Sequence, residues 1–436
     1  MSTISSPVAG PTPSTDVYEQ IRRAALAEVE AGSVDLADRG SVDDLLVALV
    51  DDHQRSARSG RGLRSLHDPA AMVARLRSSL LDFGPLTPFF DGSLDYEELI
   101  VHGSEVAYID GQGRMRAFDE PVTADEVRHV VNKLLASVGA AVDESRPMIQ
   151  TQILDGSARI GVVVPPIAAE IDLTVRRYRI RREGFGELVA WDTLSATAAS
   201  LLGAAMRTNC GVVVTGQPGA GKTTLVNALL RAVPAHRRIV ACEDTPELSI
   251  AQAHAARWRT RAAGPDGSGE VTLRDLVRVS LGMRPDVIVV GEVRGPEAYE
   301  LTRAGNAGCA MVSTIHANSA RQGLQAMVST AVMAGPNIDP VMVRHVFASI
   351  VDLVVHIARE PDGAGRRQVM EVVAVPAGQG AGVEATTEPI LTRSDFGAPL
   401  EWTGARLPAD LEQRLDRELR PLGCTTLDLL EGRVQL

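Results

Sequence analysis

The segment Gly216–Thr223 carries residue types that bind phosphate groups. It reads Gly-Gln-Pro-Gly-Ala-Gly-Lys-Thr and fits the pattern G-x-x-x-x-G-K-[ST] at every position. Such glycines let backbone N–H groups turn inward around phosphate oxygens, at a helix N-terminus whose dipole favours negative charge. We expect the Lys222 ammonium to bind the β- and γ-phosphates of a nucleotide and the Thr223 hydroxyl to hold Mg²⁺.

The surroundings of this segment favour a nucleotide site over a chance glycine-rich turn. An apolar run, Gly211–Thr215, precedes it and a helical pattern, Thr224–Val233, follows, which is the strand–loop–helix order that the motif requires. The chain contains only two lysines, and Lys222 is one of them. The predicted nucleotide-binding residues are Gly216, Gln217, Pro218, Gly219, Ala220, Gly221, Lys222, Thr223 and Thr224.

Acidic residues and a histidine follow three further apolar runs. The run Asp286–Val290 leads to Glu292, and a parallel sheet would place this carboxylate beside the phosphates. There it can bind Mg²⁺ through water or act as general base toward an attacking water. Glu243 and Asp244 follow a second run, and His316 follows a third. Taken alone, these three residues are as typical of ordinary loops as of a site.

The chain length and the pattern of apolar runs predict a multi-domain α/β protein, whose strands and helices would position these residues. The chain has 436 residues, more than one small core would need. Short apolar runs alternate with helical patterns over residues 196–376, which indicates a parallel sheet covered by helices. The predicted strands are Gly211–Thr215, Arg238–Cys242, Asp286–Val290, Ala310–Ile315 and a hairpin of Val351–Arg359 with Arg366–Val375 around Pro361-Asp362-Gly363. Residues 377–436 are expected to form a C-terminal tail with a short helix near Ala409–Leu419.

The residues before this sheet predict a smaller α+β domain at residues 84–182. Its helix starts at Thr123, which can form a capping box with Glu126, and ends near Gly139. Its predicted strands are Glu98–Ile109, Arg114–Phe118, Ile149–Leu154, Ala158–Val164 and Asp172–Arg177. We also expect a disordered tail at residues 1–15, a helical extension at 16–83 and a linker at 183–195.

The overall composition narrows the class of protein. Lys and Arg number 44 against 55 Asp and Glu, and the net charge of −11 argues against nucleic-acid binding through bulk charge. No apolar run is long enough to cross a bilayer, and residues 1–10 lack the pattern of a signal peptide. The four cysteines lie far apart without C-x-x-C spacing, so we expect a cytosolic protein without a disulfide scaffold or zinc knuckle.

The order of these motifs resembles that of the type II/IV secretion ATPases, the hexameric motors of type IV pili, type II secretion and type IV secretion. The phosphate-binding segment, the acidic box EDTPEL, the block MRPDVIVVGEVRGPEA and the His box STIHANSA follow one another at the family's approximate spacing. Upstream, the stretches GPL at 84–86, DESRPM at 143–148, VPP at 164–166 and TVRRY at 174–178 look like the CpaF branch. That branch powers tight-adherence (Tad, Flp-type) pili. The resemblance covers residues 84–375.

The resemblance implies a RecA-like P-loop ATPase core that uses ATP and Mg²⁺. In this family Glu292 matches the catalytic glutamate, and His316 matches a histidine near the γ-phosphate. Glu243 and Asp244 match the acidic box, whose acid helps to position water and Mg²⁺. The implied metal-site residues are thus Thr223, Glu243 and Glu292.

The resemblance also implies catalytic arginines in the N-terminal domain. Arg176 matches an arginine that reaches the phosphates from across the interdomain cleft, and Arg159 is a looser match to a second one. A planar guanidinium would stabilise the spread negative charge of the transition state.

The family's partners are implied in the same way. We expect a homo-hexamer docked at the inner face of the plasma membrane on inner-membrane platform proteins, acting on pilin indirectly and without direct nucleic-acid contact. One departure stands out, because Cys309 replaces a histidine that the family usually carries. Two alternatives stay open: a conjugation-type ATPase that transfers DNA or effectors, and a nucleotide-binding scaffold without hydrolysis, which only Cys309 supports.

Overall fold

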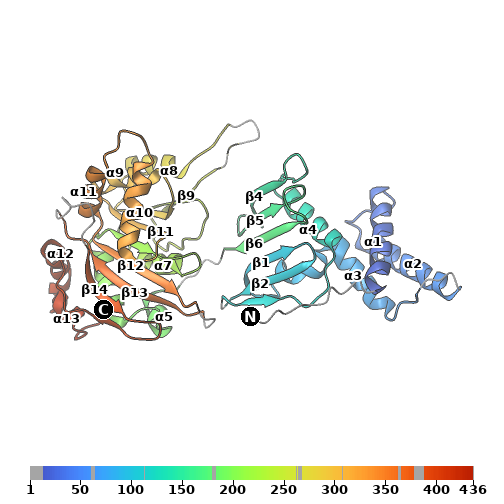
Figure 1. Cartoon of the computed structure of the whole chain (residues 1–436), viewed down its shortest axis with the longest axis horizontal. Coiled ribbons are helices and arrows are strands. Elements are labelled where there is room, and N and C mark those ends of the chain that lie inside the picture. Colours follow the sequence, from blue (N-terminus) through green and yellow to red (C-terminus); the bar gives the residue numbers. More distant parts are fainter. Residues whose placement is uncertain are drawn as a thin grey trace, which may run out of the picture. The chain divides into compact units, whose positions relative to one another are not determined.

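A computed structural model of the chain describes residues 13–59, 64–111, 113–178, 183–261, 263, 268–306, 308–361, 365–377 and 387–435. The chain divides into two compact units, residues 1–178 and 179–436. Figure 1 labels many of the helices and strands of both units. Within the described ranges, no helix combines the length and the apolar character needed to cross a membrane.

The first unit begins with three helices, α1 (Pro13–Glu30), α2 (Arg39–Arg58) and α3 (Pro69–Leu81). They pack around a small core of their own that includes Leu46 and Leu76. These helices occupy the region for which the sequence predicts a helical extension. The first helix begins inside the expected tail of residues 1–15, whose first twelve residues lie outside the described part of the chain.

A six-stranded sheet in the order β3-β2-β1-β6-β5-β4 follows, with every neighbouring pair antiparallel. Helix α4 (Ala124–Ala136) covers one face through Val127, Val130 and Leu134, and it starts at the predicted capping box. The elements are η1 (Gly84–Phe89), β1 (Tyr96–His102), β2 (Glu105–Asp110), β3 (Met115–Ala117), β4 (Met148–Ile153), β5 (Ala158–Val163) and β6 (Asp172–Arg177).

The single strand expected at Glu98–Ile109 is wrong, because two strands form there. Gly103 has a φ of +58° and turns the chain between β1 and β2. This backbone conformation favours glycine, and a Cβ at this position would lie 1.6 Å from a carboxylate oxygen of Glu170 and displace that side chain.

The second unit is a nine-stranded sheet in the order β15-β14-β13-β12-β7-β11-β10-β8-β9. The six strands from β12 to β9 run parallel, and β13, β14 and β15 add antiparallel pairs at one side. The strands are β7 (Val212–Thr215), β8 (Ile239–Glu243), β9 (Ala256–Arg259), β10 (Val287–Val293), β11 (Ala310–Ile315), β12 (Leu353–Arg359), β13 (Arg367–Ala374), β14 (Glu388–Arg393) and β15 (Leu400–Trp402). This is the α/β core that the sequence predicts.

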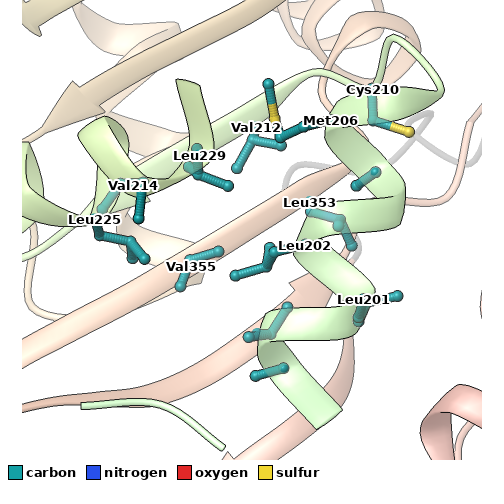
Figure 2. Packing of buried hydrophobic residues seen from close by; sticks show 14 of the residues in the cluster. Leu201, Leu202, Met206, Cys210, Val212, Val214, Leu225, Leu229, Leu353 and Val355 are labelled. Carbon is teal, nitrogen blue, oxygen red and sulfur yellow. The ribbon is translucent and has the colours of Figure 1, made fainter. Parts of the chain in front are cut away.

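Helices cover both faces of this sheet because side chains alternate along each strand. Val212 and Val214 of β7 pack toward one helical layer, whereas Val213 packs toward the other. Figure 2 shows the first layer, in which Leu202 of α6 and Leu229 of α7 lie against the strands. That layer consists of α5 (Phe185–Ala190), α6 (Ala196–Arg207), α7 (Lys222–Ala232), α12 (Ala409–Leu419) and α13 (Thr426–Leu430). The other layer consists of α8 (Leu273–Ser280), α9 (Glu297–Asn306), α10 (Ala320–Val332) and α11 (Pro340–Ile350).

Two segments expected to be loose are part of this core. The linker predicted at 183–195 contains α5, whose Leu188 is buried in the first layer. The tail predicted at 377–436 contains the expected helix at Ala409–Leu419, but also two strands that extend the sheet. Buried Leu391 and Leu415 hold these elements in place, so residues 387–435 belong to the second unit.

Candidate nucleotide site

The phosphate-binding segment forms the loop between β7 and α7, as the motif requires. Gly219 and Gly221 have φ values of +73° and +99°, a conformation that costs little only for glycine. Gly221 is also the N-cap of α7, so the loop amides lead directly into a helix N-terminus. A Cβ on Gly216 would lie 2.2 Å from the carbonyl oxygen of Ile357, which shows how closely the loop packs on β12.

Lys222 bends back over this loop. Its Nζ donates to the carbonyl oxygens of Gly216 at 3.0 Å and Gln217 at 3.1 Å. The same nitrogen lies 3.2 Å from Nδ1 of His316, which follows β11. The structure therefore brings the predicted lysine and the predicted histidine together, although 94 positions separate them in the chain.

His316 also contacts Glu292, the acid at the end of the neighbouring strand β10. Nε2 of His316 pairs with one carboxylate oxygen of Glu292, and Arg294 pairs with the other. Desolvation, together with the positive charge of Lys222, lowers the pKa of His316 despite the opposing effect of Glu292. A neutral ring suits these contacts, because Nε2–H can donate to Glu292 while Nδ1 accepts from the lysine.

Two glutamates of the acidic box make different contacts: Glu243 binds backbone amides, and Glu247 binds the side chain of Thr223. Glu243 is buried, with 3% of its surface exposed, and accepts the backbone N–H groups of Glu247 at 2.8 Å and Leu248 at 2.9 Å. Burial raises the pKa of Glu243 to about 7. The loop that Glu243 shapes brings Oε2 of Glu247 to 3.0 Å from the hydroxyl of Thr223.

The Mg²⁺-binding role expected of Glu243 stays a prediction, and a second acid of the same box contacts Thr223. Glu247, not Glu243, contacts the hydroxyl predicted to hold Mg²⁺, and Asp244 is exposed. Our reading of the sequence missed Glu247, although it lies in the same EDTPEL motif. The turn at Pro246, which carries the later acid back toward α7, is the signal that could have found it.

The residues present fit a magnesium-bound nucleoside triphosphate. The Thr223 hydroxyl and the carboxylates of Glu247 and Glu292 are the hard oxygen donors that Mg²⁺ prefers. The loop amides and the Lys222 ammonium supply the positive ends that phosphate oxygens need. Each of these groups lies at the carboxyl ends of the parallel strands, where α/β proteins bind ligands.

A pocket of about 200 Å³ opens beside the loop at the start of α7. Gly221 and Thr224, two of the predicted nucleotide-binding residues, line it together with Trp191 and Arg367. Arg367 donates from Nε to the carbonyl oxygen of Gly219 at 2.9 Å. Sequence reasoning missed Trp191 and Arg367, because they come from a predicted linker and a predicted hairpin rather than from a motif.

The two predicted arginines, Arg159 and Arg176, belong to the first unit. They lie directly opposite each other on β5 and β6, and Glu98 of β1 lies opposite Arg176. All three are on the sheet face that alternates with the core residues Ile160 and Val175. The structure thus brings the arginines together with each other, and their approach to the phosphates stays a prediction.

Cys309 lies far from the phosphate loop. It precedes β11, whereas His316 follows it, so the whole strand separates them, about 20 Å at the usual rise per residue. The Cys309 thiol is half-buried and donates to the carbonyl oxygen of Pro285 at 3.2 Å. Burial raises its pKa, so it is not a reactive thiolate.

Comparisons with known proteins agree with this geometry. A protein of Mycobacterium tuberculosis (strain CDC 1551 / Oshkosh), provisionally named conjugal transfer protein MT3759, is 33% identical over 319 residues, covering 72% of this chain and 89% of the relative. The conjugal transfer protein TrbB of Rhizobium radiobacter is 30% identical over 266 residues, covering 60% of this chain and 78% of the relative. The X-ray structure of the Yersinia pseudotuberculosis ATPase DotB covers 67% of this chain and 79% of its own, with 15% identity and a TM-score of 0.50, and so shows a shared fold.

A family model also matches more than half of the chain. The family model described as "Type II/IV secretion system protein" matches residues 125–393, which include the last three strands of the first unit's sheet, the phosphate loop, Glu292 and His316. With the loop, the two acids and the histidine arranged as described, the chain belongs to the type II/IV secretion system protein family, a family of ATPases.

Proposed function

We propose that this chain hydrolyses ATP with Mg²⁺ and works as a motor of a secretion-type assembly. The observation that carries the proposal is the contact series from Lys222 through His316 to Glu292 above a phosphate loop. It supports the proposal because the Lys222 ammonium and the Glu292 carboxylate both contact the imidazole ring of His316. The ammonium would bind the terminal phosphates, and the carboxylate would act on the attacking water.

In this proposal each residue has a distinct task. The loop amides and Lys222 hold the phosphates and neutralise the charge that grows in the transition state. Glu292 orients the water and takes its proton, while His316 holds the carboxylate in place. Thr223 and Glu247 would hold Mg²⁺, which supplies further charge neutralisation when bound. Arg176 and Arg159 would complete the site from the first unit.

The pocket beside the loop suits the remainder of the nucleotide. The flat face of Trp191 can stack on a base, and Arg366 and Arg367 line the side from which the sugar and first phosphate would enter. We propose that this pocket takes the adenine and ribose.

Two cargoes are compatible with the same chemistry. The relatives named for conjugal transfer favour a conjugation-type machine that moves DNA or effector proteins. The upstream stretches that resemble the CpaF branch favour assembly of a tight-adherence pilus. We propose the conjugation-type machine as the first candidate and the pilus as the second. In both, the working form is a homo-hexamer, peripherally bound at the inner face of the plasma membrane through partner proteins.

Glu292→Gln tests the hydrolytic part of the proposal. The variant should bind ATP as the wild type does, while phosphate release falls at least about 100-fold, because the amide cannot take a proton from water. Glu401→Gln, an exposed position on β15, is the control and should leave both measurements unchanged. If the wild type releases no phosphate under conditions that assemble a ring, the chain is a nucleotide-binding scaffold and the motor proposal fails.

The cargo is tested in the organism that encodes the chain. Deleting the gene and restoring it with either wild type or Glu292→Gln separates the two candidates by two readouts, the transfer frequency of a mobilisable plasmid and the number of surface pili. Loss of transfer with normal piliation supports the conjugation-type machine, and the reverse result supports the pilus.

A further inference from the structure

A second layer of polar contacts lies behind the phosphate loop, formed by the β12–β13 hairpin and the start of α10. Thr215, the last residue of β7, is fully buried, and its hydroxyl lies 3.0 Å from Nδ1 of His356 on β12. His356 lies directly opposite Glu371 on β13. The Glu371 carboxylate in turn accepts the backbone N–H of Ala320 at 2.7 Å. None of these residues belongs to the nucleotide-binding set described above.

The contact between Glu371 and Ala320 fixes the start of a helix. Ala320 is the first residue of α10, so its N–H has no partner within the helix. The N-cap residue Ser319 satisfies the N–H of Gln322, which leaves the N–H of Ala320 to Glu371. A carboxylate at this helix end is also favoured by the helix dipole.

The segment held in this way begins with His316. Only Ala317, Asn318 and Ser319 separate His316 from the start of α10. Asn318 accepts a hydrogen bond from Gln217 of the phosphate loop, so the short segment is tied to the loop at one end and to Glu371 at the other. A displacement of the helix start would therefore move the imidazole relative to Lys222 and Glu292.

The helix packs closely on the end of β7. A Cβ on Gly323 would lie 2.1 Å from Cγ2 of Thr215, so the backbone of α10 lies directly against this residue. The polar contact of Glu371 therefore acts on a helix start that already lies beside the strand leading into the phosphate loop.

We propose that Glu371 is a positioning residue for ATP hydrolysis: it holds the start of α10 and thereby sets His316 against Glu292 and Lys222. This inference rests on the proposed ATPase activity. It assigns a role in turnover to a residue of the β12–β13 hairpin that lies outside the phosphate-binding motif.

The test compares Glu371→Ala and Glu371→Gln with the wild-type full chain. Glu371→Ala removes the acceptor, and we expect kcat to fall about tenfold while KM for ATP changes less than about twofold, because the binding groups are untouched. Glu371→Gln keeps an acceptor oxygen for the Ala320 N–H, so it should restore kcat to within about threefold of the wild type. Glu401→Ala serves as the matched control for loss of a carboxylate on the same sheet.

A double variant separates positioning from general damage to the fold. If Glu371 acts through His316, then adding Glu371→Ala to His316→Ala should lower kcat no further than His316→Ala alone. An additive loss, or an unchanged kcat in Glu371→Ala, would overturn the inference while leaving the ATPase proposal intact. An inactive wild type would instead overturn the ATPase proposal, so the two failures are distinguishable.

Discussion

In the nine-stranded sheet, acidic residues make different contacts on the side where the parallel strands begin, here called the amino edge, and on the side where they end, the carboxyl edge. At the amino edge, where the parallel strands begin, Asp286 accepts the backbone N–H of Arg238 at 2.7 Å, and Asp352 accepts that of Gly211 at 2.8 Å. Each of these aspartates precedes one strand and fastens the start of its neighbour. At the carboxyl edge, Glu292 contacts the side chains of His316 and Arg294 instead.

The comparison teaches where chemistry is available. Carboxylates bound to backbone amides are committed to the fold, whereas a carboxylate bound to side chains at the mouth of a site can exchange partners when a ligand enters. Cys309, which departs from the family pattern, lies at the amino edge. The presence of cysteine there, in place of the family's usual histidine, therefore leaves the residues Lys222, Glu292 and His316 at the carboxyl edge unaffected.

Lys222→Ala changes the carboxyl edge and should have the largest effect on ATP hydrolysis. We expect phosphate release to fall at least about 100-fold, because the ammonium that neutralises the terminal phosphates is lost. The midpoint temperature of thermal unfolding should change little, because the Lys222 side chain is not part of the apolar core. Near-normal hydrolysis in a steady-state phosphate assay would remove Lys222 from the site and dissolve the contrast between the edges.

Asp352→Ala attacks the amino edge and should act on stability. Besides the Gly211 amide, Asp352 pairs with Arg414 of α12, with one contact at 3.3 Å. Removing it leaves both groups without this acceptor, at a cost of about 3 kcal/mol in the free energy of unfolding. Urea unfolding should show this loss of stability. The kcat of the variant, measured well below its thermal unfolding midpoint, should stay within about twofold of the wild-type value. A large drop in kcat without a drop in stability would mean that the amino edge takes part in turnover.

Glu243→Gln tests a buried carboxyl-edge acid that is bound to backbone amides. The folded state raises the pKa of Glu243 from 4.5 to about 7, so wild-type stability falls as the pH rises through this range. The glutamine variant does not titrate, and relative to wild type it should gain at most about 3 kcal/mol between pH 4.5 and pH 8. The measurement is urea unfolding of both proteins at the two pH values. Parallel pH profiles would show that the carboxyl group ionises normally.

Cys309→Ala should have the smallest effect. Turnover should stay within about twofold of the wild type and the unfolding free energy within about 1 kcal/mol, because only a weak thiol hydrogen bond is lost. A marked change in phosphate release would show that the amino edge communicates with the nucleotide site, and that the departure from the family pattern matters for activity.

The sequence predicts the parts of this molecule that have strong local signals. The strand–loop–helix around Lys222 and the capping box at Thr123 and Glu126 follow from residue types at short spacing, and the structure contains both. The convergence of His316 and Glu292 depends on strand order, which local patterns do not contain. The shared motif order of a family supplied that information.

The remaining differences have physical causes. Residues 183–195 are short of periodic apolar residues because α5 buries only one side chain deeply, Leu188. Strands β14 and β15 escape prediction because they lie at the antiparallel side of the sheet, where pairing with the neighbouring strand outweighs local preference. Glu247 and Glu371 make contacts with segments distant in sequence. Only the turn at Pro246 hints at the contact of Glu247, and nothing in the residues next to Glu371 marks its contact.

The C-terminal strands carry a practical consequence for anyone who prepares this protein. Arg393 of β14 is wholly buried; it donates to the carbonyl oxygen of Val369 at 3.1 Å and pairs with Asp192 at the end of α5. An expression fragment that stops at residue 376 would expose the edge of β13 that pairs with β14 and would remove one partner of Asp192. Exposed sheet edges recruit strands from other chains, so such a fragment should precipitate, and purification is best planned around the complete polypeptide.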